Sequence, residues 1–453
     1  MNIVIVGCGK IGSTILSDLL SEGHDIVAVD SDPQVISEIS NIYDSMYVCG
    51  SGTNCDTLVE AGVERAELFI AATGSDECNM LSCFIAKRMG AKHTIARVRN
   101  PEYSEKSFGF MRRQLDISMI MNPDQLAAQD IYYTLKLPGA VKIEYFASRS
   151  FEMVELRLKE DSPLCGVQLH ELRKRYDAKF LICAVQRGDS VVIPDGNYVL
   201  EPGDRIELTA APTEISKLLK LLGILRKQSR SVMILGASRA AYYLTRMLLA
   251  SGTAVTVIER DHQRCQHFSE LLPGATVICD DGSKQELLMA EGLTSRDAFV
   301  SLTGMDEENI LVSFFALSQG LPKVITKVNR DELHATAERL GLDSLIASRH
   351  VSSNVVSRYA RALQNSLGSN MEALYRILDG KAEAIEFTVH SDCVLTGIPL
   401  AEMRLRSGIL IAGIIRGRKT IIPSGTDCIY VGDHIIVLAA GMQIHQLTDI
   451  LLP

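Results

Sequence analysis

The sequence predicts an α/β protein built from two tandem copies of one arrangement, and three observations support this fold class. Strand-like apolar runs alternate with helical patterns twice along the 453 residues. A glycine-rich turn follows the first strand and opens a helix, and the whole pattern then returns in the second half. A chain of this length is also too long for one hydrophobic core, so several domains are expected.

The duplication is visible residue by residue. Gly7 and Gly236 each follow an apolar strand, 229 positions apart. After one inserted residue the offset becomes 230, and it joins Thr73 to Thr303. Further pairs keep this register: Gly23 with Gly252, Asp30 with Glu259, Asp32 with Asp261, Gly74 with Gly304, Asp76 with Asp306, Glu77 with Glu307, Asn79 with Asn309, and Arg97 with Lys327.

Each half continues into a short β-rich unit. Residues 181–194 (LICAVQRGDSVVIP) resemble residues 410–423 (LIAGIIRGRKTIIP), and Pro202-Gly203-Asp204 resembles Val431-Gly432-Asp433. In each unit a glycine turn separates two β-branched runs, as in a hairpin, and a closing helix is expected. A helical connector precedes each unit, one over Asp124–Leu137, ended by Pro138-Gly139, and one over about Ser352–Leu367.

The first half carries a glycine motif in the right context for a nucleotide. Gly7-Cys8-Gly9-Lys10-Ile11-Gly12 follows a strand and opens a helix, and Asp30 ends the next strand. The glycines permit a tight turn and close approach of a pyrophosphate, and the helix N-terminus offers N–H groups to the anion. The Asp30 carboxylate would accept hydrogen bonds from ribose hydroxyls. This order predicts a Rossmann-type nucleotide-binding domain.

The predicted organisation therefore has six segments. Two Rossmann-type domains are each followed by a connector and a small α+β unit. The segments are 1–122, 123–141 and 142–226 in the first half, and 230–348, 349–370 and 371–453 in the second.

The acid at position 30 also bears on the ligand. A carboxylate there disfavours a 2′-phosphate through like-charge repulsion, so NAD or NADH is preferred over the phosphorylated forms. ATP or ADP would suit the same acid and remains open. Lys10 either neutralises a further phosphate or is a solvated helix lysine.

Further ligand contacts are expected where the next strands end. Thr73 and Gly74 follow an apolar strand, at the sheet edge where ligands bind in such folds. Asp76 and Glu77 either contact the nucleotide or charge the next helix N-terminus, and Glu77 is assigned the structural role. Arg97 would reach phosphate or ribose, or form a salt bridge to one of these acids.

The second copy departs from the glycine pattern. Gly236-Ala237-Ser238-Arg239-Ala240-Ala241 keeps the first glycine alone. Arg239 takes the place of Lys10, and Glu259 takes the place of Asp30. A second nucleotide site is expected there, with a less close approach of the phosphates, and with Ser238, Thr303 and Lys327 beside it.

Composition excludes several classes. The formal net charge of −9 and a pI near 5.7 argue against nucleic acid as the main partner. No apolar run is long enough to span a bilayer, and the first strand begins at Asn2, so a cytoplasmic protein is expected. The eleven cysteines should then remain reduced.

The individual cysteines and histidines are expected to be structural. Cys8, Cys49, Cys183 and Cys279 lie in apolar strand-like runs and are predicted to behave as small hydrophobes. The segment from Asp261 to His267 faintly resembles a metal site, but it lacks an established ligand spacing and is predicted to be a solvated helix face.

Catalysis has little support. Tyr132 and Lys136 have the Tyr-xxx-Lys spacing that carries proton transfer in short-chain dehydrogenases, but here they lie in the connector. No other catalytic grouping or separate substrate domain can be assembled. A protein that is not an enzyme is expected, with an NAD-dependent oxidoreductase as the alternative.

Taken together, these motifs resemble the tandem form of the RCK (regulator of potassium conductance) family, most closely its TrkA-type regulatory subunits of Trk potassium uptake. The resemblance covers essentially the whole chain. Its marks are the motif Gly7–Gly12 with Asp30, Ala72-Thr73 through Asp76-Glu77-Cys78-Asn79, Ile95-Ala96-Arg97-Val98, Asn100-Pro101-Glu102-Tyr103, Asn122-Pro123, and Ile193-Pro194-Asp195-Gly196.

The resemblance implies a function. Such subunits assemble into a homo-oligomeric ring at the inner face of the membrane, below a TrkH/TrkG-like potassium transporter, and nucleotide binding changes the ring's shape and hence transport. The connectors would pack on neighbouring subunits. A regulator of another ion channel or antiporter remains open. The resemblance carries nucleotide contacts onto Gly7, Gly9, Lys10, Gly12, Asp30, Thr73 and Arg97, and onto Gly236, Arg239, Glu259, Thr303 and Lys327.

Overall fold

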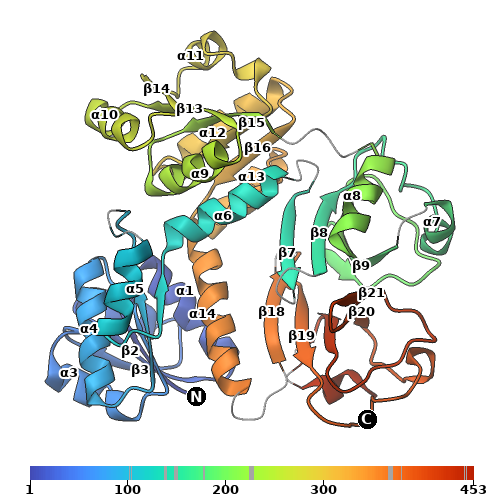
Figure 1. The fold of residues 1–453 in the computed structure, drawn as a ribbon, viewed down its shortest axis with the longest axis horizontal. Coiled ribbons are helices and arrows are strands. Elements are labelled where there is room, and N and C mark those ends of the chain that lie inside the picture. The colour runs from blue at the N-terminus through green and yellow to red at the C-terminus, as the bar shows by residue number, and fades with distance from the viewer. Residues whose placement is uncertain are drawn as a thin grey trace. The chain divides into compact units, whose positions relative to one another are not determined.

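The chain divides into two compact units in the computed structural model (Figure 1). One unit joins Met1–Tyr132 to Arg230–Ala360, and the other joins Tyr133–Ser229 to Arg361–Pro453. Like modules are thus grouped with like, because both Rossmann-type domains share the first unit and both β-rich lobes share the second. The structure describes residues 1–101, 103, 105–136, 140–146, 151–176, 179–223, 229–365, 371–378, 380–442, 444 and 446–452.

Some sequence predictions fall outside these residues. Pro138 and Gly139, expected to end the first connector, are not among them, and neither is Glu102 of the Asn100–Tyr103 motif. The same holds for the predicted segment ends at 226, 370 and 453.

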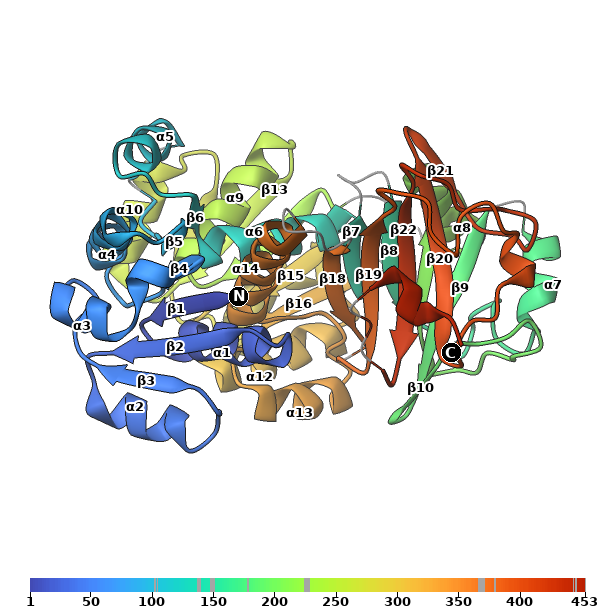
Figure 2. The ribbon, with the colours of Figure 1, turned by 90° about the horizontal axis from the view of Figure 1, so that it is seen from below.

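The first domain has a six-stranded parallel sheet in the order β3-β2-β1-β4-β5-β6. Its central strands are short apolar runs buried on both faces, as expected for parallel strands covered by helices. Figure 2 shows β1, β2 and β3 as neighbouring arrows. The strands are β1 (Asn2–Val6), β2 (Asp25–Asp30), β3 (Met46–Cys49), β4 (Leu68–Ala71), β5 (His93–Arg97) and β6 (Met119–Met121).

Helices connect these strands. Ser75 caps α4 by accepting from the Cys78 N–H, and Asn54 caps α3 in the same way, so both helices begin where the sequence offers a short polar side chain. The helices are α1 (Lys10–Ser21), α2 (Pro33–Ser40), α3 (Cys55–Glu60), α4 (Asp76–Met89), α5 (Glu105–Gln114) and the connector α6 (Pro123–Lys136).

The second domain repeats this topology in the order β14-β13-β12-β15-β16-β17. Its strands are β12 (Ser231–Leu235), β13 (Ala254–Glu259), β14 (Thr276–Cys279), β15 (Ala298–Ser301), β16 (Lys323–Lys327) and β17 (Leu345–Ile346). Its helices are α9 (Arg239–Ala250), α10 (His262–Leu271), α11 (Gln285–Ala290), α12 (Asp306–Ser318), α13 (His334–Arg339) and the connector α14 (Ser348–Asn365). The Rossmann-type fold predicted for both halves is confirmed.

The connectors bring the two Rossmann-type domains together. At the start of α6, the Asn122 amide donates to the Tyr243 hydroxyl of α9 at 2.9 Å. From α14, the Ser353 hydroxyl donates to Asp18 of α1 at 2.5 Å, and the Tyr359 hydroxyl lies 3.4 Å from His93 Nδ1. Connectors were predicted to pack on neighbouring subunits. Within the chain, each connector contacts the other repeat, because the duplication supplies a second domain within reach. Packing on neighbouring subunits stays a prediction.

The first lobe has a five-stranded antiparallel sheet in the order β10-β9-β11-β8-β7. Its elements are β7 (Lys142–Phe146), β8 (Phe151–Arg157), α7 (Leu169–Arg175), β9 (Phe180–Arg187), β10 (Ser190–Val192), β11 (Arg205–Ala210) and α8 (Pro212–Leu221). The hairpin predicted at Gly188 joins β9 to β10. The predicted closing helix is α8.

The second lobe repeats the sheet in the order β18-β19-β22-β20-β21. Its strands are β18 (Met371–Ile377), β19 (Ala382–Thr388), β20 (Ile409–Arg416), β21 (Lys419–Ile421) and β22 (His434–Ala440). The predicted closing helix is here a short 3₁₀ helix, Leu447–Ile450, in the part of this end that the structure describes.

The two lobes share one hydrophobic core between their sheets. Phe151 and Phe146 of the first lobe pack with Tyr375 and Ile436 of the second. The sheets approach closely at Gly413, where a Cβ atom would lie 2.5 Å from the Phe151 ring. The lobes therefore form one folding unit.

A repeated ion pair explains the Gly-Asp motif of the lobes. Arg187 donates through two nitrogens to Asp204, each at 2.8 Å, and Arg416 donates to Asp433 with the same distances. Both aspartates are 1% exposed. Hydrogen bonding to Asp204 raises the pKa of Arg187. The repeated motif is therefore structural.

The cysteine predictions hold in part. Cys8 and Cys183 are buried, as small hydrophobes should be. Cys49 and Cys279 are exposed, so that prediction is wrong for them. The reason is position, since each ends an edge strand, β3 or β14, and is exposed there. Among the helices that the structure describes, none is long and apolar enough to cross a bilayer.

Candidate nucleotide-binding site

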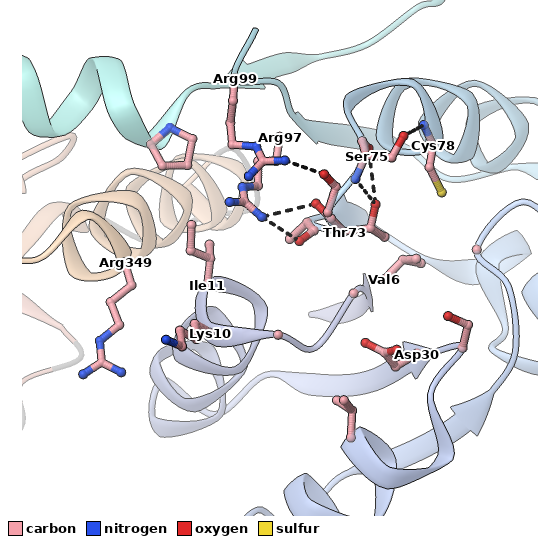
Figure 3. A pocket seen from close by; sticks show the side chains of 18 of the residues that line it. Val6, Lys10, Ile11, Asp30, Thr73, Ser75, Cys78, Arg97, Arg99 and Arg349 are labelled. Atoms are coloured by element: carbon pink, nitrogen blue, oxygen red, sulfur yellow. Dashed lines mark hydrogen bonds between the residues drawn. The ribbon is translucent and has the colours of Figure 1, made fainter. Parts of the chain in front are cut away.

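A cavity of about 690 Å³ opens at the carboxyl ends of β1 and β4. In the strand order of this sheet, β1 and β4 are neighbours whose connections run to opposite sides, which is where ligands bind in such folds. Figure 3 shows the side chains that face this cavity. The predicted residues that line it are Gly7, Gly9, Lys10, Ile11, Asp30, Thr73, Gly74, Arg97 and, from the second half, Lys327.

Two glycines shape the turn after β1, because a larger residue would not fit at either position. Gly7 has a φ of +88°, and a Cβ atom there would lie 2.6 Å from the Thr73 nitrogen. A Cβ atom on Gly12 would lie 1.8 Å from the Gly7 carbonyl oxygen. Gly12 does not line the cavity but lets α1 pack closely under the turn. Its role is to place the helix N-terminus at the cavity.

The N-terminus of α1 is open to an anion. Its N-cap residue is Gly9, which has no side chain to accept from the first N–H groups. Most helices satisfy such groups with a Ser, Thr, Asp or Asn side chain. Unsatisfied N–H groups and the positive end of the helix dipole suit a phosphate.

Asp30 has two tasks. One carboxylate oxygen accepts from the Cys8 N–H at 2.7 Å, and the other accepts from the Asp32 N–H at 3.0 Å. A carboxylate can accept about four hydrogen bonds, so capacity remains for two ribose hydroxyls. Asp30 therefore both fixes the turn and faces the cavity.

Cys8 contributes through its backbone. Its side chain points away from the cavity and donates to the Val29 carbonyl at 3.7 Å. Burial, together with the nearby Asp30 charge, raises the pKa of this thiol to about 12. Cys8 is thus an inert part of the core.

Asn79 holds the second loop of the cavity. Its side-chain oxygen accepts from the Thr73 N–H at 2.8 Å and from the Thr73 hydroxyl at 2.7 Å. Its amide nitrogen donates to the Arg97 carbonyl at 2.8 Å. The sequence showed the pair Asn79 and Asn309 in register but assigned them no role, although their repetition was the signal.

Arg97 is a partly desolvated cation at the cavity wall. It donates to the Ala72 and Thr73 carbonyls at 3.3 and 3.2 Å, and its Nε atom is buried without a partner among the described residues. Burial, together with the positive charges of Arg99 and Arg239, lowers the pKa of Arg97 to about 10. Such a group favours an anionic ligand.

Arg99 was missed by the sequence prediction. It lines the cavity beside Arg97 (Figure 3). The ion pair offered as an alternative for Arg97 is made by Arg99 instead, with Asp76 at 3.5 Å. Asp76 also accepts from the backbone N–H groups of Arg99 and Asn100, so its role is to shape this loop. Glu77, as predicted, is structural, and it accepts from Ser75 at 2.9 Å.

The second half contributes to the same cavity. Lys327, Asn329, Ser348 and Arg349 line it. Ser348 begins α14, and its buried hydroxyl has no partner among the residues that the structure describes. The Arg349 guanidinium pairs with Asp331, while its buried Nε atom is unpartnered in the same part of the chain. Asn329, Ser348 and Arg349 were not assigned from the sequence, because they approach the first repeat only through domain packing.

The corresponding turn of the second half has the same plan with different details. Gly236 has a φ of +93°, and the Glu259 carboxylate accepts from the Ala237 and Asp261 N–H groups at 2.8 and 3.0 Å. Ser238, however, caps α9 by accepting from the Ala241 N–H at 3.3 Å. One of the first N–H groups of α9 is thus already engaged.

The remaining loop of the second half copies the first. Thr303 donates through its N–H and hydroxyl to Asn309, whose amide reaches the Lys327 carbonyl. Arg239 begins α9 and lies close enough to Arg97 to lower its pKa. Lys327, predicted for the second site, faces the cavity of the first.

The features weighed for catalysis or metal binding lie elsewhere. Tyr132 and Lys136 belong to α6 and do not line the cavity. In the described part of the chain, no group of three His, Cys, Asp or Glu side chains could hold a metal ion. The segment Asp261–His267 is not simply a solvated face, because Cys265 within it is buried.

Fold and cavity define a tandem-repeat protein whose Rossmann-type domains line a cavity rich in cationic side chains. The model of the TrkA-N domain matches residues 3–123 and 232–348, and that of the TrkA-C domain matches residues 153–223 and 384–452. The chain belongs to the TrkA family.

Individual proteins agree with this assignment. A Trk system potassium uptake protein TrkA homolog of Archaeoglobus fulgidus is 30% identical over 450 residues, which cover 99% of this chain and 100% of that protein. The Trk system potassium uptake protein TrkA of Vibrio alginolyticus is 29% identical over 451 residues, covering 98% and 96%.

Solved structures show the same fold. The GsuK channel bound to NAD has a TM-score of 0.62 at 18% identity and covers 97% of this chain and 77% of that one. GsuK bound to ADP has a TM-score of 0.51 at 15% identity and covers 81% and 69%. The predicted RCK architecture is thereby confirmed.

Proposed function

We propose that this chain is a nucleotide-responsive regulatory subunit of a potassium uptake system, and that it binds its nucleotide in the cavity of the first repeat. The observation that carries the proposal is the open N-terminus of α1 below Asp30, in a cavity to which both repeats contribute. The role in potassium transport is inferred from relatives of the same length, which are named as Trk system potassium uptake proteins.

The cavity favours a ligand with several negative charges. Five cationic side chains line it, against the two carboxylates Asp30 and Asp124. The cations are Lys10, Arg97, Arg99, Lys327 and Arg349. A pyrophosphate would lie on the N-terminus of α1, with its ribose at Asp30. NAD or NADH is the preferred ligand, because the Asp30 carboxylate repels a 2′-phosphate, and ATP or ADP is the alternative.

Because residues of both repeats line the cavity, a bound ligand could change how the two Rossmann-type domains are arranged. A nucleotide in this cavity would touch α1 and β4 of the first domain together with Ser348 and Arg349 of α14. By linkage, it shifts the arrangement of the two domains only if it binds one arrangement more tightly than another. In an oligomeric ring this shift would alter the membrane transporter to which the ring is bound.

The residues support binding better than catalysis. An oxidoreductase needs an acid or base facing the nicotinamide, and the Tyr132 and Lys136 pair lies away from the cavity. We therefore propose that the protein is not an enzyme. The nucleotide would act through its presence in the cavity and would not be chemically changed.

Calorimetric titration with NAD, NADH, ADP and ATP, with turnover measured in parallel, tests the binding step. Saturable binding without turnover is expected. Binding by none of the four would contradict the proposal, and steady NADH oxidation would replace it with the oxidoreductase.

Transport tests the regulatory step. Arg349→Gln keeps the helix but removes the charge that α14 brings to the cavity. The variant is expected to weaken the effect of nucleotide on potassium uptake by vesicles that contain the transporter. Arg264→Gln, which changes an exposed residue of α10, is the control and should leave that effect unchanged. Uptake that ignores nucleotide in the unmodified protein would refute the regulatory step while leaving binding intact.

A further inference from the structure

Two thiols and an imidazole meet at one edge of the second Rossmann-type domain, outside the cavity already described. Cys279 is the last residue of the edge strand β14, and its side chain is exposed. Cys265 lies one turn into α10 and is buried. His262 begins the same helix, and its Nδ1 atom lies 3.6 Å from Cys279 Sγ.

The strand register places both thiols beside one residue. Glu259 is paired with Cys279 across β13 and β14, and the Cys265 thiol donates to the Glu259 carbonyl at 3.1 Å. Burial and a hydrogen bond with Cys279 raise the pKa of Cys265 to about 12. Cys265 thus remains a protonated, shielded thiol, while Cys279 faces solvent.

We propose that Cys265 and Cys279 form an oxidisable dithiol, which a hydroperoxide converts into a disulfide with His262 as the proton acceptor. Exposure lets the oxidant reach Cys279. The imidazole within hydrogen-bonding distance can take the thiol proton, which produces the nucleophilic thiolate. Cys265 is then the resolving thiol, because the strand register and its hydrogen bond to the Glu259 carbonyl place it beside Cys279.

The reaction balances in two steps. Cys279 Sγ attacks one oxygen of hydrogen peroxide, the O–O bond breaks, and the hydroxide released takes the proton held by His262 and leaves as water. The sulfenic acid formed on Cys279 is attacked by Cys265 Sγ, the S–O bond breaks, and the Cys265 proton leaves with the hydroxyl as a second water. Two thiols are oxidised to a disulfide, and one peroxide is reduced to two waters.

The first repeat has one of these three residue types at the equivalent positions and lacks the other two. Cys49 ends β3 in the position of Cys279 and is equally exposed. Ile36 stands where the second repeat has Cys265, and Pro33 stands where it has His262. Cys49 therefore has neither the resolving thiol nor the base, and it serves as a matched internal control. A reversible disulfide also suits a protein expected to be in a reducing compartment.

The location predicts which half responds. The bond would close beside Glu259, which holds the turn after β12 through Ala237. Oxidation would therefore alter the ligand position of the second repeat and leave Asp30 untouched. This consequence rests on the proposed function, whereas the disulfide itself does not.

One peptide reports the reaction. Arg264 and Lys284 flank the pair, so trypsin releases both cysteines in the single peptide 265–284. The reduced full-length chain would be treated with hydrogen peroxide, blocked with iodoacetamide and digested without reductant. The peptide is expected to lose two hydrogens and to carry no alkyl group, and dithiothreitol should restore both alkylation sites.

Variants separate the roles. Cys265→Ile, which copies the first repeat, should leave a sulfenic acid on Cys279 that dimedone traps. His262→Gln should slow disulfide formation by up to about thirtyfold, because an unassisted thiol is only a few per cent thiolate at pH 7. Cys49→Ser should change nothing. Recovery of peptide 265–284 with both cysteines alkylated, or with Cys279 over-oxidised while Cys265 is still alkylated, would overturn the proposal.

Discussion

The N-termini of α1 and α9 occupy equivalent places in the two repeats but differ in the residue that caps the helix. Gly9 leaves the first N–H groups of α1 unsatisfied, whereas Ser238 accepts from the Ala241 N–H of α9. Beneath these turns, Gly12 allows a contact that the methyl group of Ala241 excludes. The acids Asp30 and Glu259, by contrast, make the same two backbone contacts.

The comparison separates what a Rossmann-type turn needs for folding from what it needs for a ligand. The acid and the first glycine, Gly7 or Gly236, serve the turn itself and are present in both repeats. Open helix N–H groups serve the anion and are kept in the first repeat. We infer that the first repeat holds the tighter site and that the second retains its fold.

The sharpest way to break this comparison is to give the first repeat the residue of the second. In Gly12→Ala, the added Cβ atom would lie 1.8 Å from the Gly7 carbonyl, so α1 must move away from the turn. We expect nucleotide affinity to fall about a hundredfold, which corresponds to about 2.8 kcal/mol. Calorimetry measures the change. Ala241→Gly is the matched control and should leave the tight site unaltered; equal losses in both variants would contradict the comparison.

In the lobes, by contrast, the same substitution is expected to have the same effect in both repeats, because their ion pairs are alike. Asp204→Asn and Asp433→Asn each remove one buried carboxylate that accepts from an arginine and a backbone N–H. Each should lower the free energy of unfolding by roughly 2 to 3 kcal/mol, a value reduced by solvent screening of the arginine. Urea unfolding of both variants checks this. A clear difference between them would show that the lobes are not equivalent.

The acids sharpen the comparison, since their structural roles match. Asp30→Asn should weaken nucleotide binding about tenfold, because a charge-assisted bond to ribose is lost. Glu259→Gln should leave the tight site nearly unchanged. Both should lower the melting temperature to a similar degree, since an amide has one acceptor oxygen for the two backbone N–H groups that each carboxylate accepts. Calorimetry and thermal unfolding together distinguish ligand contact from turn support.

The smallest expected effect concerns pH. Burial, with the nearby charges of Lys87 and Lys92, lowers the pKa of His93, which contacts Tyr359 of the other repeat. The unfolded chain then binds more protons than the folded one below about pH 6.5, the ordinary pKa of histidine. The free energy of unfolding is therefore unaffected by this group above that pH and falls as the pH drops below it. Thermal unfolding between pH 7.5 and 5.5 should show a slight loss of stability. His93→Gln should flatten that dependence, and an unchanged slope would remove His93 as the cause.

Much of the fold was readable from the sequence, because it depends on local signals. Strand periodicity, the turn at Gly7 and the register of the repeat predicted both sheets and the acid at Asp30. The connectors were also found as helices, although α14 begins at Ser348 rather than near Ser352.

The rest depends on contacts between distant segments. Which domain each connector packs on is decided by long-range contacts such as Asn122 with Tyr243, and no local pattern encodes them. For the same reason the sequence did not place Ser348 or Arg349 at the first cavity. Cys279 was misread because an apolar strand looks the same at the edge of a sheet as at its centre.

The stoichiometry of nucleotide binding tests the central claim most directly. Titration of the unmodified chain with NAD and, separately, with ATP would count the tight sites per chain. The account predicts one tight site, which Gly12→Ala abolishes, and a weaker second site at most. Two sites of equal affinity, or one tight site that persists in Gly12→Ala, would contradict it.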